Sequence, residues 1–334
     1  MLSHVLILIL SICVKATVPD SPIIGILAQP SSVSGQYVAA SYVKFVEMAG
    51  GRAVPLSYYA TNETTAYWLR QLNGVLFPGG SASIPDAVRY ALEYSINKYN
   101  QDNEIFPIWG TCLGFEFLVE AFGGSLQEFE AENITLPLFL TEAASTSYLY
   151  GGKNKETLRK WLSDENLTMN NHQYGAAPTE FQKPPLANIF TVLSTSQDSA
   201  GNSFVSTIEA KAGYPIFGVQ YHPEKNAFET GLVPATGLPY EVTNHSSHAV
   251  SLTSSLAHAF MDVARKSNNS FDSSVTEQAS LFSNCPVSTD MSPEFVQVYF
   301  FHTNWTGDLL PCSYSHLYHH EGAASSFSSS ITTS

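Results

Sequence analysis

The sequence predicts a single α/β domain built on a doubly wound, mostly parallel β-sheet flanked by helices. Short apolar runs of strand length alternate with helical patterns through the first third of the chain, a rhythm typical of a parallel sheet covered on both faces. The chain has 334 residues, of which 44% are hydrophobic, so it can bury one sizeable core. A cysteine between two glycines follows the last of these runs, at the sheet edge where such folds bind ligands.

Sequence patterns place strands and helices alternately in this region. The strands are apolar runs at 23–28, 52–56, 74–77 and 105–109. The helices are amphipathic segments at 36–49, 62–72 and 86–99. The first of them ends at Gly50-Gly51, and the second begins with Asn62 as its N-cap.

The second half of the chain is richer in β-structure. Short strands are predicted at 188–194, 204–210 and 215–220, followed by a helix at 249–265. Residues 313–334 are rich in Ser and His without an apolar period, so we expect a disordered tail. A metal site at His316, His319 and His320 is the alternative to a solvated tail, and no metal or other cofactor is expected.

Charge argues against two classes of partner. Lys and Arg number 15 against 29 Asp and Glu, a net charge of −14, which disfavours binding to nucleic-acid phosphates and to anionic membrane surfaces. No run after the N-terminal segment is long and apolar enough for a membrane helix, so no membrane span is expected.

The N-terminus predicts a signal peptide at 1–16. Residues 5–14 form an apolar run too short to span a bilayer, and Val14-Lys15-Ala16 fits cleavage after Ala16. The preceding segment contains His4 but no Lys or Arg, so a buried strand remains the alternative. Cleavage leaves a main domain at 17–312 ahead of the tail.

Cysteines and glycosylation motifs point to an oxidising compartment. Cleavage removes Cys13, and Cys285 and Cys312 could then form a disulfide that leaves Cys112 as the free thiol. Candidate N-glycosylation sites are Asn62, Asn133, Asn166, Asn244, Asn268 and Asn304. Together with the signal peptide they predict a secreted glycoprotein.

Cys112 is the strongest candidate for a catalytic residue. It lies in Gly110-Thr-Cys112-Leu-Gly114, between an apolar run and a helical pattern. The two glycines permit a sharp strand-to-helix turn that presents the side chain at a helix N-terminus, where the dipole favours an anion. We therefore expect a nucleophilic thiol with a lowered pKa. A cysteine used only in packing is the alternative, but it would not need flanking glycines.

A base and oxyanion donors can be assigned around this thiol. His222 follows directly on the last predicted strand, so it reaches the same sheet edge, and Glu224 is close enough to support its imidazole. Candidate oxyanion donors are the backbone N–H of Leu113 and an N–H of the Gly79-Gly80 loop. A structural histidine and an ordinary glycine turn are the alternatives.

These residues resemble the class I glutamine-amidotransferase superfamily. The resemblance lies in Gly110-Thr-Cys-Leu-Gly114, Phe77-Pro-Gly-Gly80 and Gln220-Tyr-His-Pro-Glu224. Over about residues 22–300 the chain is similar, within that superfamily, to the gamma-glutamyl hydrolases, which are folylpoly-gamma-glutamate carboxypeptidases. The segments that carry this similarity are Pro22-Ile-Ile-Gly-Ile-Leu27, Ala39-Ala-Ser-Tyr-Val-Lys44, Trp109-Gly-Thr-Cys-Leu-Gly-Phe-Glu116 and Gly218-Val-Gln-Tyr-His-Pro-Glu-Lys225.

The resemblance implies roles for several residues. Cys112 would be the nucleophile, His222 its base and Glu224 the third member, and His172 matches a family histidine near the scissile bond. It further implies a gamma-glutamyl hydrolase-like catalytic domain at 17–312 that needs no cofactor, acts on folylpoly-gamma-glutamate, is secreted, lysosomal or vacuolar, and forms a homodimer.

The expected substrate raises two further expectations. Free α-carboxylates need cations, for which Lys44, Arg70, Arg89 and Lys225 are candidates, and Tyr37 or Tyr42 could stack on a pteridine. Two other functions remain alternatives. One is a glutaminase subunit that passes ammonia to a synthase, and the other is a non-catalytic secreted binding protein.

Overall fold

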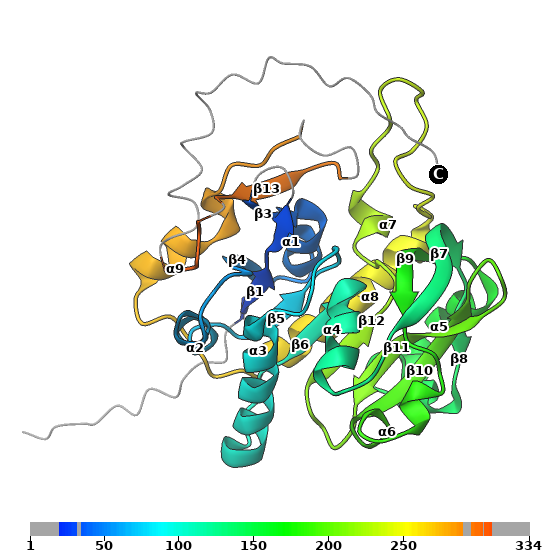
Figure 1. Ribbon diagram of the computed structural model, residues 1–334, viewed down its shortest axis with the longest axis horizontal. Helices are drawn as coiled ribbons and strands as arrows, with labels where there is room; N and C mark the ends of the chain where they lie inside the picture. Colours follow the sequence, from blue (N-terminus) through cyan, green and yellow to red (C-terminus); the bar gives the residue numbers. More distant parts are fainter. Residues whose placement is uncertain (1–19, 32–34, 290–294, 303, 309–334) are drawn as a thin grey trace, which may run out of the picture.

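The computed structural model describes residues 20–31, 35–289, 295–302 and 304–308. A central eight-stranded sheet has the strand order β4-β1-β5-β6-β12-β11-β10-β8, and helices cover both of its faces (Figure 1). The expected signal peptide at 1–16, Cys312 and the tail at 313–334 lie outside the described residues. The domain boundaries therefore stay predictions.

The central sheet is parallel through its first five strands and antiparallel beyond them. The parallel strands are β4 (Arg52–Leu56), β1 (Ile23–Leu27), β5 (Gly74–Phe77), β6 (Ile108–Thr111) and β12 (Ile216–Val219). The antiparallel strands are β11 (Ser203–Ala210), β10 (Phe190–Gln197) and β8 (Phe139–Leu140). The doubly wound, mostly parallel sheet flanked by helices is thereby confirmed as a single domain.

Alternating side chains of the central strands build a core on each face. In β1, Ile24 and Ile26 belong to one core and Ile23 and Leu27 to the other, as the period of a strand requires. The first core is covered by α1 (Ala40–Glu47) and α8 (Ser247–Ala264). The second is covered by α2 (Asn62–Leu69), α3 (Asp86–Asn97) and α4 (Leu113–Ala121).

Two small sheets and several short helices complete the described fold. The sheets are the ribbon of β7 (Gln127–Leu136) with β9 (Thr168–Gly175), and β13 (Val298–Phe301) with β3 (Gly35–Ala39) and β2 (Gln29–Ser31). The remaining α-helices are α5 (Glu156–Asp164), α6 (Leu186–Ile189), α7 (Lys225–Phe228) and α9 (Ser274–Ser280). The described residues also form one short π-helix, η1 (Lys98–Asp102). Short 3-10 helices are η2 (Glu142–Ser145), η3 (Lys153–Lys155), η4 (Glu180–Gln182) and η5 (Phe282–Asn284).

The first predicted helix is wrong at its start. Residues from Gly35 to Ala39 form β3, which pairs with β2 and with β13 from the far end of the chain, so the helix begins only at Ala40. The cap of the second helix is also wrong, because Thr61 rather than Asn62 holds it: Thr61 Oγ1 accepts a hydrogen bond from the Thr64 N–H at 3.1 Å.

Candidate active site

Cys112 lies on a strained turn between β6 and α4. Its backbone has φ 51° and ψ −107°, a conformation that residues with side chains adopt rarely and that the surrounding structure must hold. The Cys112 N–H donates to Val219 O of β12 at 2.9 Å, and Cys112 O accepts from the Glu116 N–H of α4 at 3.0 Å. The sharp strand-to-helix turn expected from the sequence is present.

Gly110 and Gly114 make this turn possible by letting backbones touch. A Cβ at Gly110 would lie 2.5 Å from Gly114 O, and one at Gly114 would lie 2.1 Å from Phe77 O. Neither position can hold a side chain without displacing main-chain atoms. The glycines therefore fix β5, β6 and α4 against one another beneath the cysteine.

His222 reaches the same sheet edge from β12. Its Nδ1 lies 2.7 Å from Glu224 Oε1, and a carboxylate at that distance holds the proton on Nδ1 and leaves Nε2 as the basic nitrogen. Gly79 lies between His222 and the cysteine: a Cβ built on it would be 2.6 Å from His222 Cε1 and 3.3 Å from Cys112 Cβ. The structure thus brings these four residues together.

Tyr42 of α1 also belongs to this group, through hydrogen-bonding contacts that the sequence did not predict. Its hydroxyl accepts a hydrogen bond from the Gly79 N–H at 2.8 Å and lies 3.2 Å from His222 Nδ1. The side chain is only 3% exposed, and burial raises the pKa of its phenol, with the charges of Glu224 and Cys112 acting in the same direction. The Tyr42 ring does not line the cleft in this state, so its stacking on a pteridine stays a prediction.

The expected lowering of the Cys112 pKa is also wrong for this state. Burial raises the pKa of the thiol well above its usual value, and Glu116 adds to the rise, whereas Lys225 and the Leu113 N–H oppose it. Desolvation outweighs the helix dipole because the side chain is only 5% exposed. The resting thiol is protonated at neutral pH, so a base must take its proton during any reaction.

Cys112 lines a cleft of ≈ 620 Å³. Glu116 and Glu120 of α4 form one side, and the β7–β9 ribbon contributes Glu132 and His172. Burial lowers the pKa of His172 to about 4, so its imidazole is neutral above that pH. The predicted His172 therefore shares the cleft with the cysteine. The ribbon that carries it was not predicted, because its half-exposed strands mix polar and apolar residues without a clear pattern.

The three proposed oxyanion donors differ in their present contacts. The Leu113 N–H hydrogen-bonds the Cys112 sulfur, and Gly80 lines the cleft. The Gly79 N–H is not free, since it donates to Tyr42. Leu113 and Gly80 line the cleft, whereas Gly79 does not.

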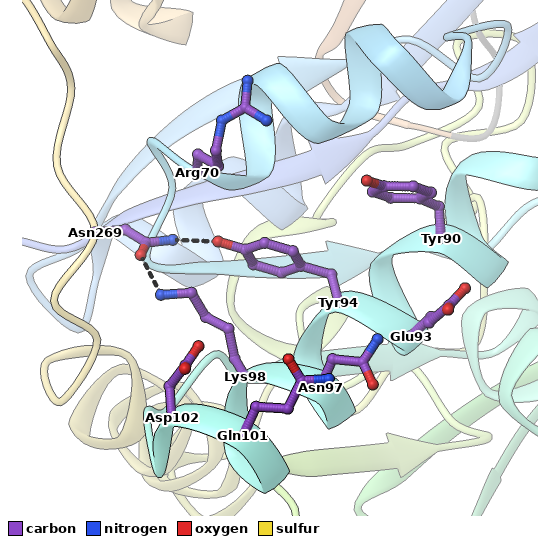
Figure 2. Close-up of a pocket in the computed structure, with 9 residues that line it drawn as sticks. All are labelled: Arg70, Tyr90, Glu93, Tyr94, Asn97, Lys98, Gln101, Asp102 and Asn269. Carbon is purple, nitrogen blue, oxygen red and sulfur yellow. Dashed lines mark hydrogen bonds between the residues drawn. The ribbon is translucent and has the colours of Figure 1, made fainter.

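The cations expected to bind α-carboxylates do not line this cleft. Arg70 borders a separate pocket with Lys98, Tyr90 and Tyr94, where Asn269 hydrogen-bonds Tyr94 and Lys98 (Figure 2). Arg89 lines a third pocket, beside Phe122. These two assignments are wrong, because helices α2 and α3 carry both arginines away from the cleft.

The two lysines are engaged elsewhere. Lys225 is 3% exposed and donates to Glu241, at 2.6 Å from its Oε2. The Lys44 ammonium lies 5.9 Å from the centre of the Phe228 ring. Tyr37, the other candidate for stacking, packs its ring 6.1 Å from that of Phe295.

Cys285 and the candidate glycosylation sites, which predicted an oxidising compartment, do not line the cleft. Cys285 is disulfide-bonded, and its expected partner, Cys312, lies outside the described residues. Five asparagines of the candidate glycosylation sites are exposed, namely Asn62, Asn133, Asn166, Asn268 and Asn304. The sixth, Asn244, is partly buried. Among the described residues, no group of three His, Cys, Asp or Glu is arranged to hold a metal ion. Within the same ranges, no helix has the length and apolar character needed to cross a bilayer.

Comparison with known proteins gives consistent matches. The peptidase C26 family model matches residues 22–224. Gamma-glutamyl hydrolase B of Dictyostelium discoideum is 35% identical over 305 residues, covering 86% of this chain and 85% of that protein. Gamma-glutamyl hydrolase 1 of Arabidopsis thaliana is 37% identical over 265 residues, covering 74% and 73%. Human gamma-glutamyl hydrolase is 35% identical over 300 residues, covering 84% and 89%.

The family match spans both the strained turn at Cys112 and His222. With relatives of this similarity along most of the chain, the protein belongs to the peptidase C26 family of cysteine-type hydrolases that cleave γ-glutamyl bonds.

Proposed function

We propose that this chain hydrolyses the γ-glutamyl amide bonds of folylpoly-γ-glutamates, with Cys112 as nucleophile and His222 as general acid and base. The observation that carries the proposal is that Cys112, on its strained turn beside the cleft, and His222, held by Glu224, both lie next to Gly79: a Cβ built on Gly79 would be 3.3 Å from Cys112 Cβ and 2.6 Å from His222 Cε1. The relatives that match most of this chain are named gamma-glutamyl hydrolases, and this supports the γ-glutamyl linkage as the bond that is cleaved.

The first half-reaction forms a thioester. His222 Nε2 takes the Cys112 proton as the sulfur attacks the γ-carbonyl carbon, and the N–H groups at Leu113 and Gly80 bind the resulting oxyanion. Glu224 stabilises the imidazolium, which passes its proton to the leaving nitrogen as the C–N bond breaks. The products of this step are a free amine and a γ-glutamyl thioester.

The second half-reaction releases the acid. His222 accepts a proton from water, whose oxygen attacks the thioester carbonyl, and the C–S bond breaks. The sulfur recovers a proton from the imidazolium, so the site returns to its starting state. Neutral His172 forms part of the ribbon wall of the cleft, where its Nδ1 lies 2.8 Å from Tyr174 O and its Nε2 3.2 Å from Asn170 Oδ1.

Replacement of the sulfur tests this mechanism. Cys112→Ala should lower turnover of pteroyl-pentaglutamate by roughly 10⁴-fold or more, because the covalent route is lost. Chromatographic analysis of the products gives both the rate and the linkage cleaved. The melting temperature should stay within a few degrees of that of the wild type, as a control for folding. A variant that keeps the wild-type rate would end the assignment of Cys112.

The same assay separates the alternatives. A glutaminase subunit would release ammonia from free glutamine faster than it cleaves a γ-linked oligoglutamate. A non-catalytic binding protein would bind the oligoglutamate without releasing any product. Cleavage of the γ-linked chain alone supports the hydrolase.

We also propose a secreted, lysosomal or vacuolar glycoprotein that forms a homodimer. The exposed sequons and the disulfide-bonded Cys285 support the compartment. Glycosidase treatment of protein from a secreting host should increase its electrophoretic mobility, and light scattering should give twice the chain mass. An unshifted band or a monomer mass would contradict the respective part.

A further inference from the structure

Gln29 is a buried amide without hydrogen-bond partners. It is the first residue of β2 and is 1% exposed, and neither its Oε1 nor its Nε2 has a partner among the described residues. Leaving a buried polar atom unpaired costs about 1–3 kcal/mol. Two such atoms on one side chain mark a place where a bound water or a ligand group can supply the hydrogen bonds.

The sheet register places this amide beside the loop that touches the nucleophile. β1 and β5 run parallel with Ile26 next to Leu76, so the chains that continue from them bring Gln29 alongside Gly79 and Gly80. A Cβ on Gly80 would lie 3.0 Å from Gln29 Cγ and 3.1 Å from Gln29 Oε1. Because Gly80 also lines the cleft, it touches both the amide and the substrate space.

The cleft offers no cation to a carboxylate, because no Lys or Arg lines it in the described part of the chain. Its acidic lining residues are Glu116, Glu120 and Glu132, of which Glu116 is neutral below about pH 8. A carboxylate bound there must therefore rely on neutral donors. A γ-glutamyl group carries a carboxylate and a nitrogen on its α-carbon, three bonds from the carbonyl carbon that is attacked. A side-chain amide offers a donor for the first and an acceptor for the second.

We propose that Gln29 recognises the α-substituents of the γ-glutamyl group, with Nε2 donating to the α-carboxylate and Oε1 accepting from the α-nitrogen. This assignment rests on the proposed γ-glutamyl hydrolysis. The side chains of Cys112 and His222 are each 5% exposed, so solvent reaches them little more than it reaches Gln29, which is 1% exposed. Cβ atoms built on Gly79 and Gly80 would lie within 3.3 Å of His222, Cys112 and Gln29, so this loop separates Gln29 from the cleft and the entering γ-glutamyl group must displace it to reach the amide.

Binding to the inactive full-length chain tests this role without requiring turnover. Adding Gln29→Met to the Cys112→Ala variant should raise the Kd of γ-glutamyl-p-nitroanilide about 10- to 100-fold. This is the change in Kd expected when one hydrogen bond to a charged group is lost. The Kd of butyryl-p-nitroanilide, the same acyl chain without α-substituents, should stay unchanged. Calorimetry gives both constants. The melting temperature should not fall, since Met removes the two unpaired atoms.

Gln71 supplies the matched control. It follows the end of α2, is 3% exposed and does not line the cleft, and its Oε1 is also unpartnered, so Gln71→Met should leave both Kd values unchanged. Equal changes for the two anilides in Gln29→Met, or no change for either, would overturn the role of Gln29. If the wild type binds γ-glutamyl-p-nitroanilide with this dependence on Gln29 but hydrolyses no γ-glutamyl compound, the proposed function fails and the recognition stands.

Discussion

At the residue scale, the candidate site depends on hydrogen bonds that pass from one side chain to the next. Glu224 holds His222, and the Tyr42 hydroxyl lies between that imidazole and the Gly79 N–H. The position of the Gly79 loop beside Cys112 is therefore coupled to the base. A change that removes only the hydroxyl should disturb the geometry of the reaction more than the stability of the fold.

Tyr42→Phe tests this coupling. The change leaves the Gly79 N–H without an acceptor, and we expect kcat/KM for a γ-glutamyl substrate to fall roughly 10- to 100-fold. Steady-state kinetics measures the loss. Tyr150→Phe is the control, because Tyr150 is also buried and loses hydrogen bonds to Tyr221 and Thr207, yet lies outside the cleft. Equal losses of activity in the two variants would mean that Tyr42 acts only through stability.

Residues with a local signature could be predicted from the sequence, and those defined by distant contacts could not. Cys112 has its two glycines beside it, and His222 ends an apolar strand, so each position carries its own pattern. Tyr42 and Gln29 look like ordinary helix and strand residues. Their importance comes from the Gly79-Gly80 loop: the register of β1 and β5 brings Gln29 beside it, and the packing of α1 brings the Tyr42 hydroxyl to the Gly79 N–H.

At the element scale, the same distinction explains which strands were predicted. β4 and β5 match their predicted ranges, 52–56 and 74–77, because buried parallel strands are continuous apolar runs. β3 was predicted as helix, since its apolar spacing suits both forms and its pairing with β13 decides between them. Long-range pairing of this kind leaves no local pattern.

Gly114→Ala tests the packing of α4 on β5. The new Cβ would lie 2.1 Å from Phe77 O, a main-chain atom that cannot rotate away, so we expect a loss of about 3 kcal/mol or more in the free energy of unfolding. Urea denaturation measures it. Gly175→Ala is the control, because its nearest neighbour is the Phe129 ring at 3.3 Å, and it should cost less than about 1 kcal/mol. Similar losses in both variants would contradict the tight contact.

At the scale of the whole molecule, buried titratable groups make stability depend on pH. Burial raises the pKa of Glu116 from 4.5 to about 8, so the stability contributed by its neutral form is complete below pH 4.5 and is lost as the pH rises through about 8. Burial lowers the pKa of His172 from 6.5 to about 4, so its contribution is lost as the pH falls across that range. Between about pH 4.5 and 6.5 the contributions of these two groups change in opposite directions, and above that range only the loss from Glu116 continues.

Glu116→Gln isolates the first of these groups. The amide keeps an oxygen to accept the hydrogen bond from Gln220 Nε2 at 3.0 Å, but it cannot ionise. At about pH 4 the variant and the wild type should melt at similar temperatures, since both side chains are then neutral. At about pH 9 the variant should melt about 4 °C or more above the wild type, because it avoids a buried carboxylate that costs at least about 2 kcal/mol. Calorimetric scans across this range measure the difference, and parallel pH curves for the two proteins would show that Glu116 ionises as freely in the folded chain as in the unfolded one.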